Sequence, residues 1–205
     1  METAGVPSRL NIANALTVLR IAGVPVFGWL LLSEDGQDVS WRVWAWVAFT
    51  VLMLTDRVDG DLARRKNLVT DFGKLADPIA DKALTGMAFI GLAIIFHDHA
   101  YGWLFVTVSA IVLAREWGIT IMRFFIKKYG VMPASQGGRI KTTLQAFALA
   151  GYVLPFELWD TALTDGLRWA THVLMAGAVA VTVVTGVQYV RDARAIRREA
   201  LAGRE

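Results

Sequence analysis

The 205-residue chain has no cysteine, and this absence excludes disulfides, thiolate metal sites and cysteine nucleophiles. Charged side chains are scarce as well, because Asp, Glu, Lys and Arg make up only 19% of the residues, against about a quarter in soluble domains. The formal net charge of +3 is too small for a surface that binds nucleic acid. The composition therefore disfavours a soluble globular domain, and we expect no nucleic-acid partner.

Apolar residues, in contrast, make up 55% of the chain and gather in long blocks. A membrane-spanning helix needs about 20 mostly apolar residues, and backbone groups inside lipid must bond within their own segment. The blocks therefore predict an all-α integral membrane protein with six transmembrane helices. They cover residues 15–32, 41–54, 79–96, 103–126, 142–156 and 169–189. The second and fifth blocks are short, so we expect their helices to extend into polar residues.

The basic residues predict how the chain is oriented in the membrane. With the N-terminus inside, only Arg42 and Arg168 fall in outer segments, and the outer loops are acidic. The positive-inside rule then places both termini and the segment after the second block in the cytoplasm, as in a protein of the bacterial cytoplasmic membrane. Short connections predict one domain over residues 1–205. We expect an interfacial segment at about 8–14 and a basic tail at about 190–205.

Residues 55–82, from the end of the second block to the start of the third, contain four aspartates at helical spacing. Asp56 and Asp59 are three residues apart, and Asp77 and Asp81 are four apart, so each pair shares a helix face. Pro78 suits the first turn of the second of these helices. Two antiparallel helices would bring the four carboxylates together at the cytoplasmic membrane surface.

Carboxylates held this close repel one another unless cations neutralise them. Carboxylate oxygens are suited to Mg²⁺, Mn²⁺ or Ca²⁺, and two divalent ions about 3.5–4 Å apart stabilise phosphoryl chemistry. Gly60 and Ala63 clear space beside Asp59, and Arg64 is placed to bind a phosphate. The alternative interpretation is a solvated loop with helix-capping aspartates.

At these residues the chain resembles the CDP-alcohol phosphotransferases. Their signature is D-x-x-D-G-x-x-A-R, eight residues, then G-x-x-x-D-x-x-x-D. Every fixed position is filled here, by Asp56, Asp59, Gly60, Ala63, Arg64, Gly73, Asp77 and Asp81. The resemblance implies a six-span enzyme that moves a phosphoalcohol unit from a CDP-activated donor to a hydroxyl acceptor and releases CMP.

The resemblance also implies a role for each of these residues. Asp56, Asp59 and Asp77 would be ligands of two divalent cations, Mg²⁺ or Mn²⁺. Asp81 would be a metal ligand and the general base, although spacing alone does not distinguish it from Asp77. The donor nucleotide and its diphosphate would be bound by Gly60, Ala63, Gly73 and Arg64.

A second group of basic residues indicates that the acceptor carries a phosphate. Arg115 and Arg123 are eight apart on the fourth predicted span, and lipid exposure of Arg115 would cost about 2.5 kcal/mol or more. Arg139 and Lys141 lie in residues 137–142, which we expect to form a flexible basic turn that opens the fifth span, and Arg191 follows the sixth span. Alternatively, Arg115 pairs with a motif aspartate, and Arg139, Lys141 and Arg191 anchor the chain to anionic lipid.

Within the family, the chain resembles the bacterial phosphatidylglycerophosphate synthases. The resemblance lies in residues 14–20, which include Asn14, Thr17 and Arg20, and in residues 114–116 and 138–143. It implies CDP-diacylglycerol as donor, sn-glycerol 3-phosphate as acceptor, and a homodimer. Asn14 and Thr17 would line the nucleotide site, or instead cap the helix beside an arginine that reaches outward.

Three alternatives stay open. The acceptor could be inositol phosphate, phosphatidylglycerol or serine. An intramembrane prenyltransferase also uses aspartates and Mg²⁺, but the later half of the chain has no second aspartate-rich motif. A divalent-cation transporter would carry carboxylates along its spans, whereas those here gather at one end.

Overall fold

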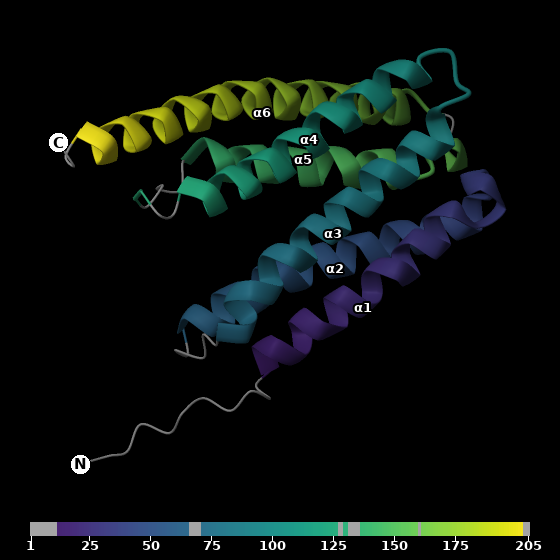
Figure 1. The fold of residues 1–205 in the computed structure, drawn as a ribbon. Coiled ribbons are helices and arrows are strands. Elements are labelled where there is room, and N and C mark those ends of the chain that lie inside the picture. Colours follow the sequence, from purple (N-terminus) through teal and green to yellow (C-terminus); the bar gives the residue numbers. More distant parts are fainter. Residues whose placement is uncertain (1–11, 66–70, 127–128, 131–135, 160, 203–205) are drawn as a thin grey trace. The chain divides into compact units, whose positions relative to one another are not determined.

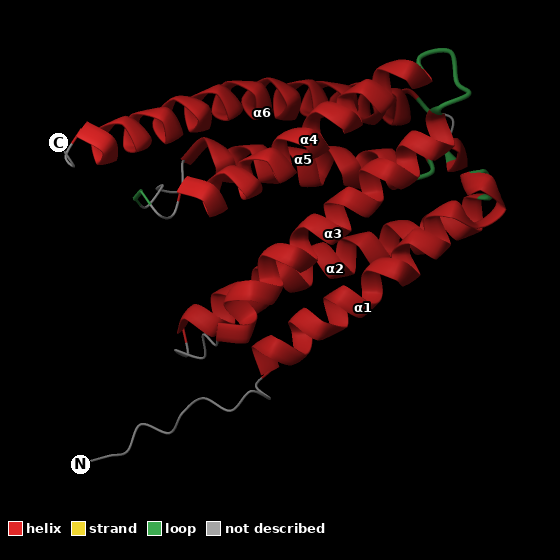
Figure 2. Ribbon diagram, viewed as in Figure 1, coloured by secondary structure: helices red, strands yellow, loops and turns green. Residues whose placement is uncertain are grey.

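The computed structural model describes residues 12–65, 71–126, 129–130, 136–159 and 161–202. Side chains are described for residues 15–55, 79–126, 129–130, 137–156, 158–159 and 161–202. Within these ranges the chain is all helical, with no strand (Figure 2). The α-helices, labelled in Figure 1, are α1 (Ile12–Leu32), α2 (Val39–Arg65), α3 (Asp71–Phe96), α4 (Gly102–Ile126), α5 (Gln136–Val153) and α6 (Ala162–Ala202). Two short 3-10 turns, η1 (Ser33–Gly36) and η2 (Phe156–Leu158), complete the described structure.

Long apolar helices identify a multi-pass membrane protein. Four segments are long and apolar enough to cross a bilayer, namely Ala15–Gly36, Ile79–Phe96, Gly102–Ile126 and Ala162–Ala202. Large apolar side chains also lie exposed on these helices, among them Trp29, Phe124 and Trp169, which a soluble monomer does not tolerate over wide areas. The apolar part of α2, Val39–Thr55, is shorter. The all-α membrane fold is thus confirmed, while six spans and their orientation stay predictions.

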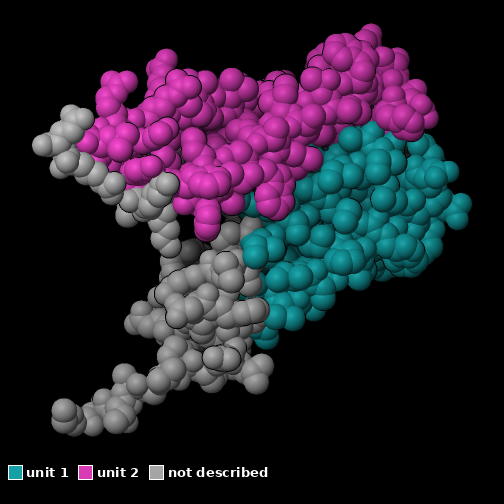
Figure 3. Space-filling view, in the orientation of Figure 1, with its two compact units in different colours: residues 1–95, 152–158 teal, residues 96–151, 159–205 magenta. Residues whose placement is uncertain are grey.

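The chain divides into two compact units, which Figure 3 colours separately. Unit 1 contains residues 1–95 and 152–158, and unit 2 contains residues 96–151 and 159–205. The aspartate motif therefore belongs to unit 1, and the basic residues proposed to bind the acceptor belong to unit 2.

One buried stripe of α1 forms much of the core of unit 1. Thr17, Arg20, Val24, Phe27 and Leu31 recur every three or four residues, so they share a helix face, and each is at most 5% exposed. α1 packs against α2, and the rings of Phe27 and Phe49 stack at a tilt with centroids 5.4 Å apart. α3 adds Leu84, Ala88, Phe89 and Leu92 to this core. The face is apolar except toward the N-terminal end of α1, where Thr17 and Arg20 lie.

The turn between α1 and α2 depends on a glycine. Glu34, Asp35 and Gly36 all have positive φ angles, of 51°, 54° and 71°. A Cβ atom on Gly36 would lie 2.4 Å from the Ile95 side chain. Glycine thus permits both the left-handed backbone and the close approach of α3.

Arg42 is one of the two basic residues that the predicted orientation places in outer segments. It has a structural role in unit 1. It is 7% exposed, and its Nη2 donates to the carbonyls of Tyr152 and Leu154 at 3.1 and 3.3 Å. These carbonyls lie at the end of α5, where helical acceptors lack partners within the helix. Arg42 therefore joins the start of α2 to the α5–α6 connection.

We expect Arg42→Ala to lower the free energy of unfolding by about 2 kcal/mol, because it removes a charged donor from two partly buried carbonyls. The matched control is Arg168→Ala, since Arg168 is partly exposed and pairs with the exposed Asp165 at 3.6 Å, an interaction that contributes under about 1 kcal/mol. Unfolding of both variants in detergent, followed by circular dichroism, measures the difference. Equal losses would show that the Arg42 bonds do not stabilise the protein.

Unit 2 is built on the packing of α4 against α6. The buried face of α6 includes Thr171, Ala178, Thr182 and Thr185. The threonine hydroxyls donate to backbone carbonyls of their own helix, as Thr182 does to Ala178 at 2.6 Å. These bonds satisfy polar groups that would otherwise destabilise a membrane bundle.

α6 is longer than the predicted span. Its 41 residues extend about 60 Å at 1.5 Å per residue, whereas the hydrocarbon core is about 30 Å thick. The basic tail expected at 190–205 is therefore the helical end of α6 as far as Ala202. Residues 8–11 of the expected interfacial segment lie outside the described residues.

Two local predictions were wrong. α3 begins at Asp71, so Pro78 lies inside the helix and not in its first turn. A proline within a helix removes one backbone bond, and the flanking turns continue the helix without it. α5 begins at Gln136, so residues 137–142 are helical and do not form a flexible turn, although Gly137 and Gly138 do lie at a helix start as predicted. The backbone N–H groups of a first helical turn have no acceptor within the helix. A glycine pair at this position therefore interrupts no hydrogen bond of α5.

Candidate active site

The backbone places the aspartate motif on two helices of unit 1. α2 remains helical through Arg65 and contains Asp56 and Asp59, and α3 begins at Asp71 and contains Asp77 and Asp81. The two helices are joined by residues 66–70 (Figure 1). The short apolar block therefore does continue into polar residues, as expected. The helical spacing within each pair of aspartates is confirmed.

Most side chains of the motif lie outside the described residues. This applies to Asp56, Asp59, Gly60, Ala63, Arg64, Gly73 and Asp77. The meeting of the four carboxylates thus stays a prediction. Among the side chains that the structure describes, no group of three or more acidic or histidine residues lies close enough to hold a metal.

Asp81 is the motif residue whose side chain is described. It is partly exposed, and it lies one helical turn before Thr85, whose Oγ1 donates to the Asp81 carbonyl at 2.9 Å. Leu84 and Ala88, on the buried side of α3, fix this part of the helix in the core of unit 1. The position of Asp81 is therefore set by a packed helix and not by a loop.

Thr17 and Arg20 lie on α1 in the same unit. Thr17 is 2% exposed, and Arg20 is wholly covered by protein and has polar or charged partners. An arginine that reaches out toward lipid head groups would not be covered in this way. The structure thus favours an internal role for these two residues, while the side chain of Asn14 lies outside the described part.

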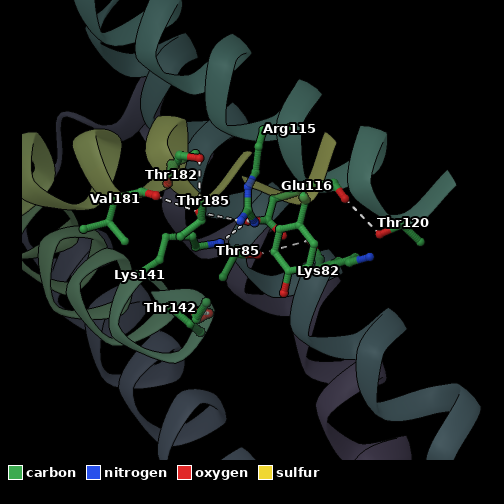
Figure 4. Close-up of polar contacts among 12 residues, drawn as sticks. Lys82, Thr85, Arg115, Glu116, Thr120, Lys141, Thr142, Val181, Thr182 and Thr185 are labelled. Atoms are coloured by element: carbon green, nitrogen blue, oxygen red, sulfur yellow. Dashed lines mark hydrogen bonds and ion pairs between the residues drawn. The ribbon is translucent and has the colours of Figure 1, made fainter. Parts of the chain in front are cut away.

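In unit 2, Arg115 and three further polar side chains, from three helices in all, form one connected group (Figure 4). Arg115 of α4 donates through Nη2 to Thr185 Oγ1 of α6 at 2.7 Å. Its Nη1 lies 3.3 Å from Oε1 of Glu116, which also accepts from Lys141 Nζ of α5. We call Arg115, Glu116, Lys141 and Thr185 the α4–α6 cluster.

The α4–α6 cluster is largely shielded from solvent. The side chains of Arg115, Glu116 and Lys141 are 14%, 18% and 5% exposed. Arg115 Nε is buried, and no partner for it occurs among the described residues. Two cations therefore share one carboxylate, which leaves an excess positive charge and a free donor in a partly dry site.

Tyr189 connects a further arginine to this region. Arg123 Nη2 donates to the Tyr189 hydroxyl at 2.8 Å. The guanidinium carbons of Arg115 and Arg123 lie 5.7 and 5.0 Å from the centre of the Tyr189 ring, within the range of cation–π attraction. The prediction that these arginines share a face of α4 is thus confirmed.

Small residues let the three helices approach one another here. A Cβ atom on Gly137 would lie 2.7 Å from the Thr185 side chain, and one on Gly186 would lie 3.5 Å from that of Arg115. The first turn of α5 therefore reaches the part of α6 that also binds Arg115. Unpaired N–H groups in a first helical turn favour anions.

The structure does not bring every predicted acceptor residue into the α4–α6 cluster. The side chains of Arg139 and Arg191 are exposed, and neither bonds to the cluster within the described part of the chain. In contrast, Arg115 pairs with a carboxylate, as its depth in an apolar block predicted. Sequence reasoning missed the roles of Glu116, Thr185 and Tyr189, because a local pattern does not show which residues of distant helices meet.

Comparison with known proteins agrees with the motif. The model of the CDP-alcohol phosphatidyltransferase family matches residues 10–184. A probable phosphatidylglycerophosphate synthase of Mycobacterium tuberculosis (strain H37Rv) is 43% identical over 196 residues, covering 96% of this chain and 87% of the relative.

Two further relatives are named CDP-diacylglycerol–glycerol-3-phosphate 3-phosphatidyltransferase. The protein of Bacillus subtilis is 34% identical over 87% of this chain and 93% of its own length. That of Escherichia coli K12 is 31% identical over 91% of this chain and 97% of its own length. With the filled motif and the family match, these similarities show that the chain belongs to the CDP-alcohol phosphatidyltransferase family.

Proposed function

We propose that this enzyme transfers a phosphatidyl group from CDP-diacylglycerol to sn-glycerol 3-phosphate, giving phosphatidylglycerophosphate and CMP. Membership of the family supports a CDP-activated donor and a hydroxyl acceptor. The names of the relatives support the acceptor. The observation that carries the choice of acceptor is the α4–α6 cluster, because buried cations with an unpaired donor suit a phosphate monoester.

The motif of unit 1 is proposed to bind the donor and two divalent cations, Mg²⁺ or Mn²⁺. The residues fit such ions, because α2 and α3 each carry two aspartates at helical spacing and carboxylate oxygens suit hard cations. Asp56, Asp59, Asp77 and Asp81 would hold the ions, which when bound offset the negative charge that develops on the phosphates. Gly60, Ala63, Arg64, Gly73, Asn14 and Thr17 would hold the CDP group.

Asp81 is proposed to accept the proton of the acceptor. The acceptor hydroxyl oxygen forms a bond to the β-phosphorus of the donor. The bond from that phosphorus to the oxygen bridging the two phosphates breaks, and CMP leaves with this oxygen. The hydroxyl proton passes to the Asp81 carboxylate. A partly exposed carboxylate on a packed helix is fixed in place yet accessible for such a transfer.

The acceptor's phosphate is proposed to bind the basic residues of unit 2. Arg115 and Lys141 supply buried donors, and Arg123 adds a charge that Tyr189 holds in place. Arg139 and Arg191, which are exposed, would contact the phosphate from the solvent side or bind anionic lipid heads. Serine and phosphatidylglycerol lack a phosphate monoester, so this cluster favours glycerol 3-phosphate or inositol phosphate over them.

The surroundings of the site follow from the lipid donor. We infer that the motif and both termini face the cytoplasm of a bacterial cell, and that a groove open to the inner leaflet lets the acyl chains stay in the bilayer. The whole chain would act as one catalytic domain in a homodimer. A metal site sealed from lipid would contradict the groove.

The experiment that tests this function measures CMP release by the purified chain in detergent, with CDP-diacylglycerol and a panel of acceptors. We expect turnover with sn-glycerol 3-phosphate, and little with inositol phosphate, phosphatidylglycerol or serine. EDTA should abolish turnover, and added Mg²⁺ or Mn²⁺ should restore it. Turnover with inositol phosphate but not glycerol 3-phosphate would refute the acceptor, and full activity in EDTA would refute the metal.

A further inference from the structure

Glu116 is the acidic member of an otherwise cationic cluster. Its Oε1 accepts from Arg115 Nη1 at 3.3 Å and from Lys141 Nζ, and Figure 4 shows the three side chains turned toward one another. The nitrogen atoms that bind the carboxylate are therefore those that the proposed function assigns to the acceptor's phosphate. Carboxylate and phosphate oxygens make the same kind of charge-assisted hydrogen bond.

We propose that Glu116 is an internal counter-ion that competes with the acceptor's phosphate for Arg115 and Lys141. This inference rests on the proposed function, because it takes the α4–α6 cluster as the phosphate site. When the site is empty, the carboxylate balances two cations that are mostly covered by protein. When a phosphate binds, its charge adds to that of the carboxylate, and the two anions repel at short range.

The reaction supplies a reason for such competition. The acceptor's phosphate takes no part in bond making, so the product still carries it and still binds the same cations. Cations without a counter-ion would hold the product tightly and slow its release. A carboxylate that reoccupies Arg115 and Lys141 lowers the free-energy cost of release. Glu116 thus sets the affinity for substrate and product together.

If Glu116 had only a structural role, removal of its carboxylate would change the affinity for phosphate in the opposite direction. If the carboxylate only held Lys141 of α5 against α4, its removal would disorder the cluster and weaken phosphate binding. If it competes, its removal frees both cations and tightens phosphate binding. The sign of the change in affinity therefore distinguishes the two roles.

The test measures phosphate affinity without turnover. The purified full chain in neutral detergent, without CDP-diacylglycerol, is titrated with inorganic phosphate and with sn-glycerol 3-phosphate while its unfolding temperature is followed. We expect Glu116→Gln to lower the Kd for both ligands about tenfold, because at short range and low dielectric a removed charge has a large effect. An unchanged or higher Kd would overturn the proposal.

Two variants accompany Glu116→Gln. Glu116→Asp keeps the charge but has a shorter reach, so its Kd should fall about threefold, between those of wild type and Glu116→Gln. If Glu116→Gln does not fold, this variant decides the question, and a Kd equal to or above that of wild type overturns the proposal. Glu199→Gln removes an exposed carboxylate elsewhere on α6, and its Kd should equal that of wild type.

Steady-state kinetics give an independent readout. For Glu116→Gln we expect a several-fold lower kcat because product leaves slowly, a several-fold higher kcat/KM for glycerol 3-phosphate, and an unchanged kcat/KM for CDP-diacylglycerol. Equal changes in both kcat/KM values would indicate a general disturbance and would count against the proposal.

A further titration, with a lipid, tests whether the cluster binds a soluble phosphate or a lipid head group. Phosphatidic acid in the same detergent presents a phosphate monoester on a lipid. If it alone raises the unfolding temperature, the cluster binds lipid heads and the proposal fails. Soluble phosphates could bind more tightly to Glu116→Gln while the enzyme releases no CMP with glycerol 3-phosphate as acceptor. That result would support the counter-ion role of Glu116 and refute the proposed acceptor.

Discussion

Asp81→Asn should lower kcat by a factor of about 10³ while the protein still folds and binds CDP-diacylglycerol, since removal of a general base alone costs about 10²- to 10⁴-fold. The amide has nearly the size of the carboxylate but accepts no proton and is a weaker ligand for a hard cation. Because the Asp81 side chain is partly exposed and the amide keeps nearly its shape, we expect the exchange to leave the packed core of unit 1 intact.

CMP release measures this loss, and the donor-induced rise in unfolding temperature measures donor binding. The matched control is Asp165→Asn in the first turn of α6, which removes a surface carboxylate paired with Arg168 at 3.6 Å and should leave kcat unchanged. If Asp81→Asn retains kcat within tenfold of wild type, Asp81 is not the base. Asp77, which spacing alone does not distinguish from Asp81, would then be the candidate.

The helices themselves were predictable because their signal is local. The fourth block, 103–126, matches α4 (Gly102–Ile126), and the first, 15–32, matches α1 except for its first turn. Continuous apolar runs bounded by polar residues determine such helices, because the bilayer requires satisfied backbone bonds over its full thickness. The helical placement of the four aspartates could be predicted from their spacing of three and four residues.

Helix ends in polar sequence were less predictable. α3 begins at Asp71 and α5 at Gln136, both among polar and glycine-containing residues. Hydropathy does not change at these helix starts, and helix propensity predicts boundaries only weakly. Proline at position 78 favours a helix start, yet it lies within α3. Interactions beyond the local sequence decide such boundaries.

The composition of the α4–α6 cluster was the least predictable part of the candidate site. Arg115 and Lys141 could be found because charge in an apolar helix needs a partner. The partners themselves, Glu116 and Thr185, could not be identified, because Lys141 is 25 residues from Glu116 and Arg115 is 70 residues from Thr185. Only the packing of helices far apart in the sequence brings these residues together.

Lys141→Gln and Arg115→Gln should each raise the KM for glycerol 3-phosphate roughly 100-fold, since a lost charge-assisted hydrogen bond contributes about 1.5–3 kcal/mol. Each exchange removes a cation that is mostly covered by protein and leaves Glu116 to repel the incoming phosphate. The KM for CDP-diacylglycerol should change less than threefold, because the donor is assigned to the motif of unit 1. Steady-state CMP release with each substrate varied in turn measures both constants.

Two further variants, the double variant of Arg115 and Lys141 and a change at an exposed arginine, test whether the cluster binds the phosphate. Because Arg115 and Lys141 share one carboxylate, their effects should not be independent, and the double variant should raise KM by less than the product of the single changes. Arg139→Gln removes an exposed cation of the same helix as Lys141 and should raise KM less than about fivefold, in line with the small contribution of exposed charges. Equal effects of Arg139 and Lys141 would place the phosphate at the surface, whereas a large rise in the KM for CDP-diacylglycerol would assign the cluster to the donor.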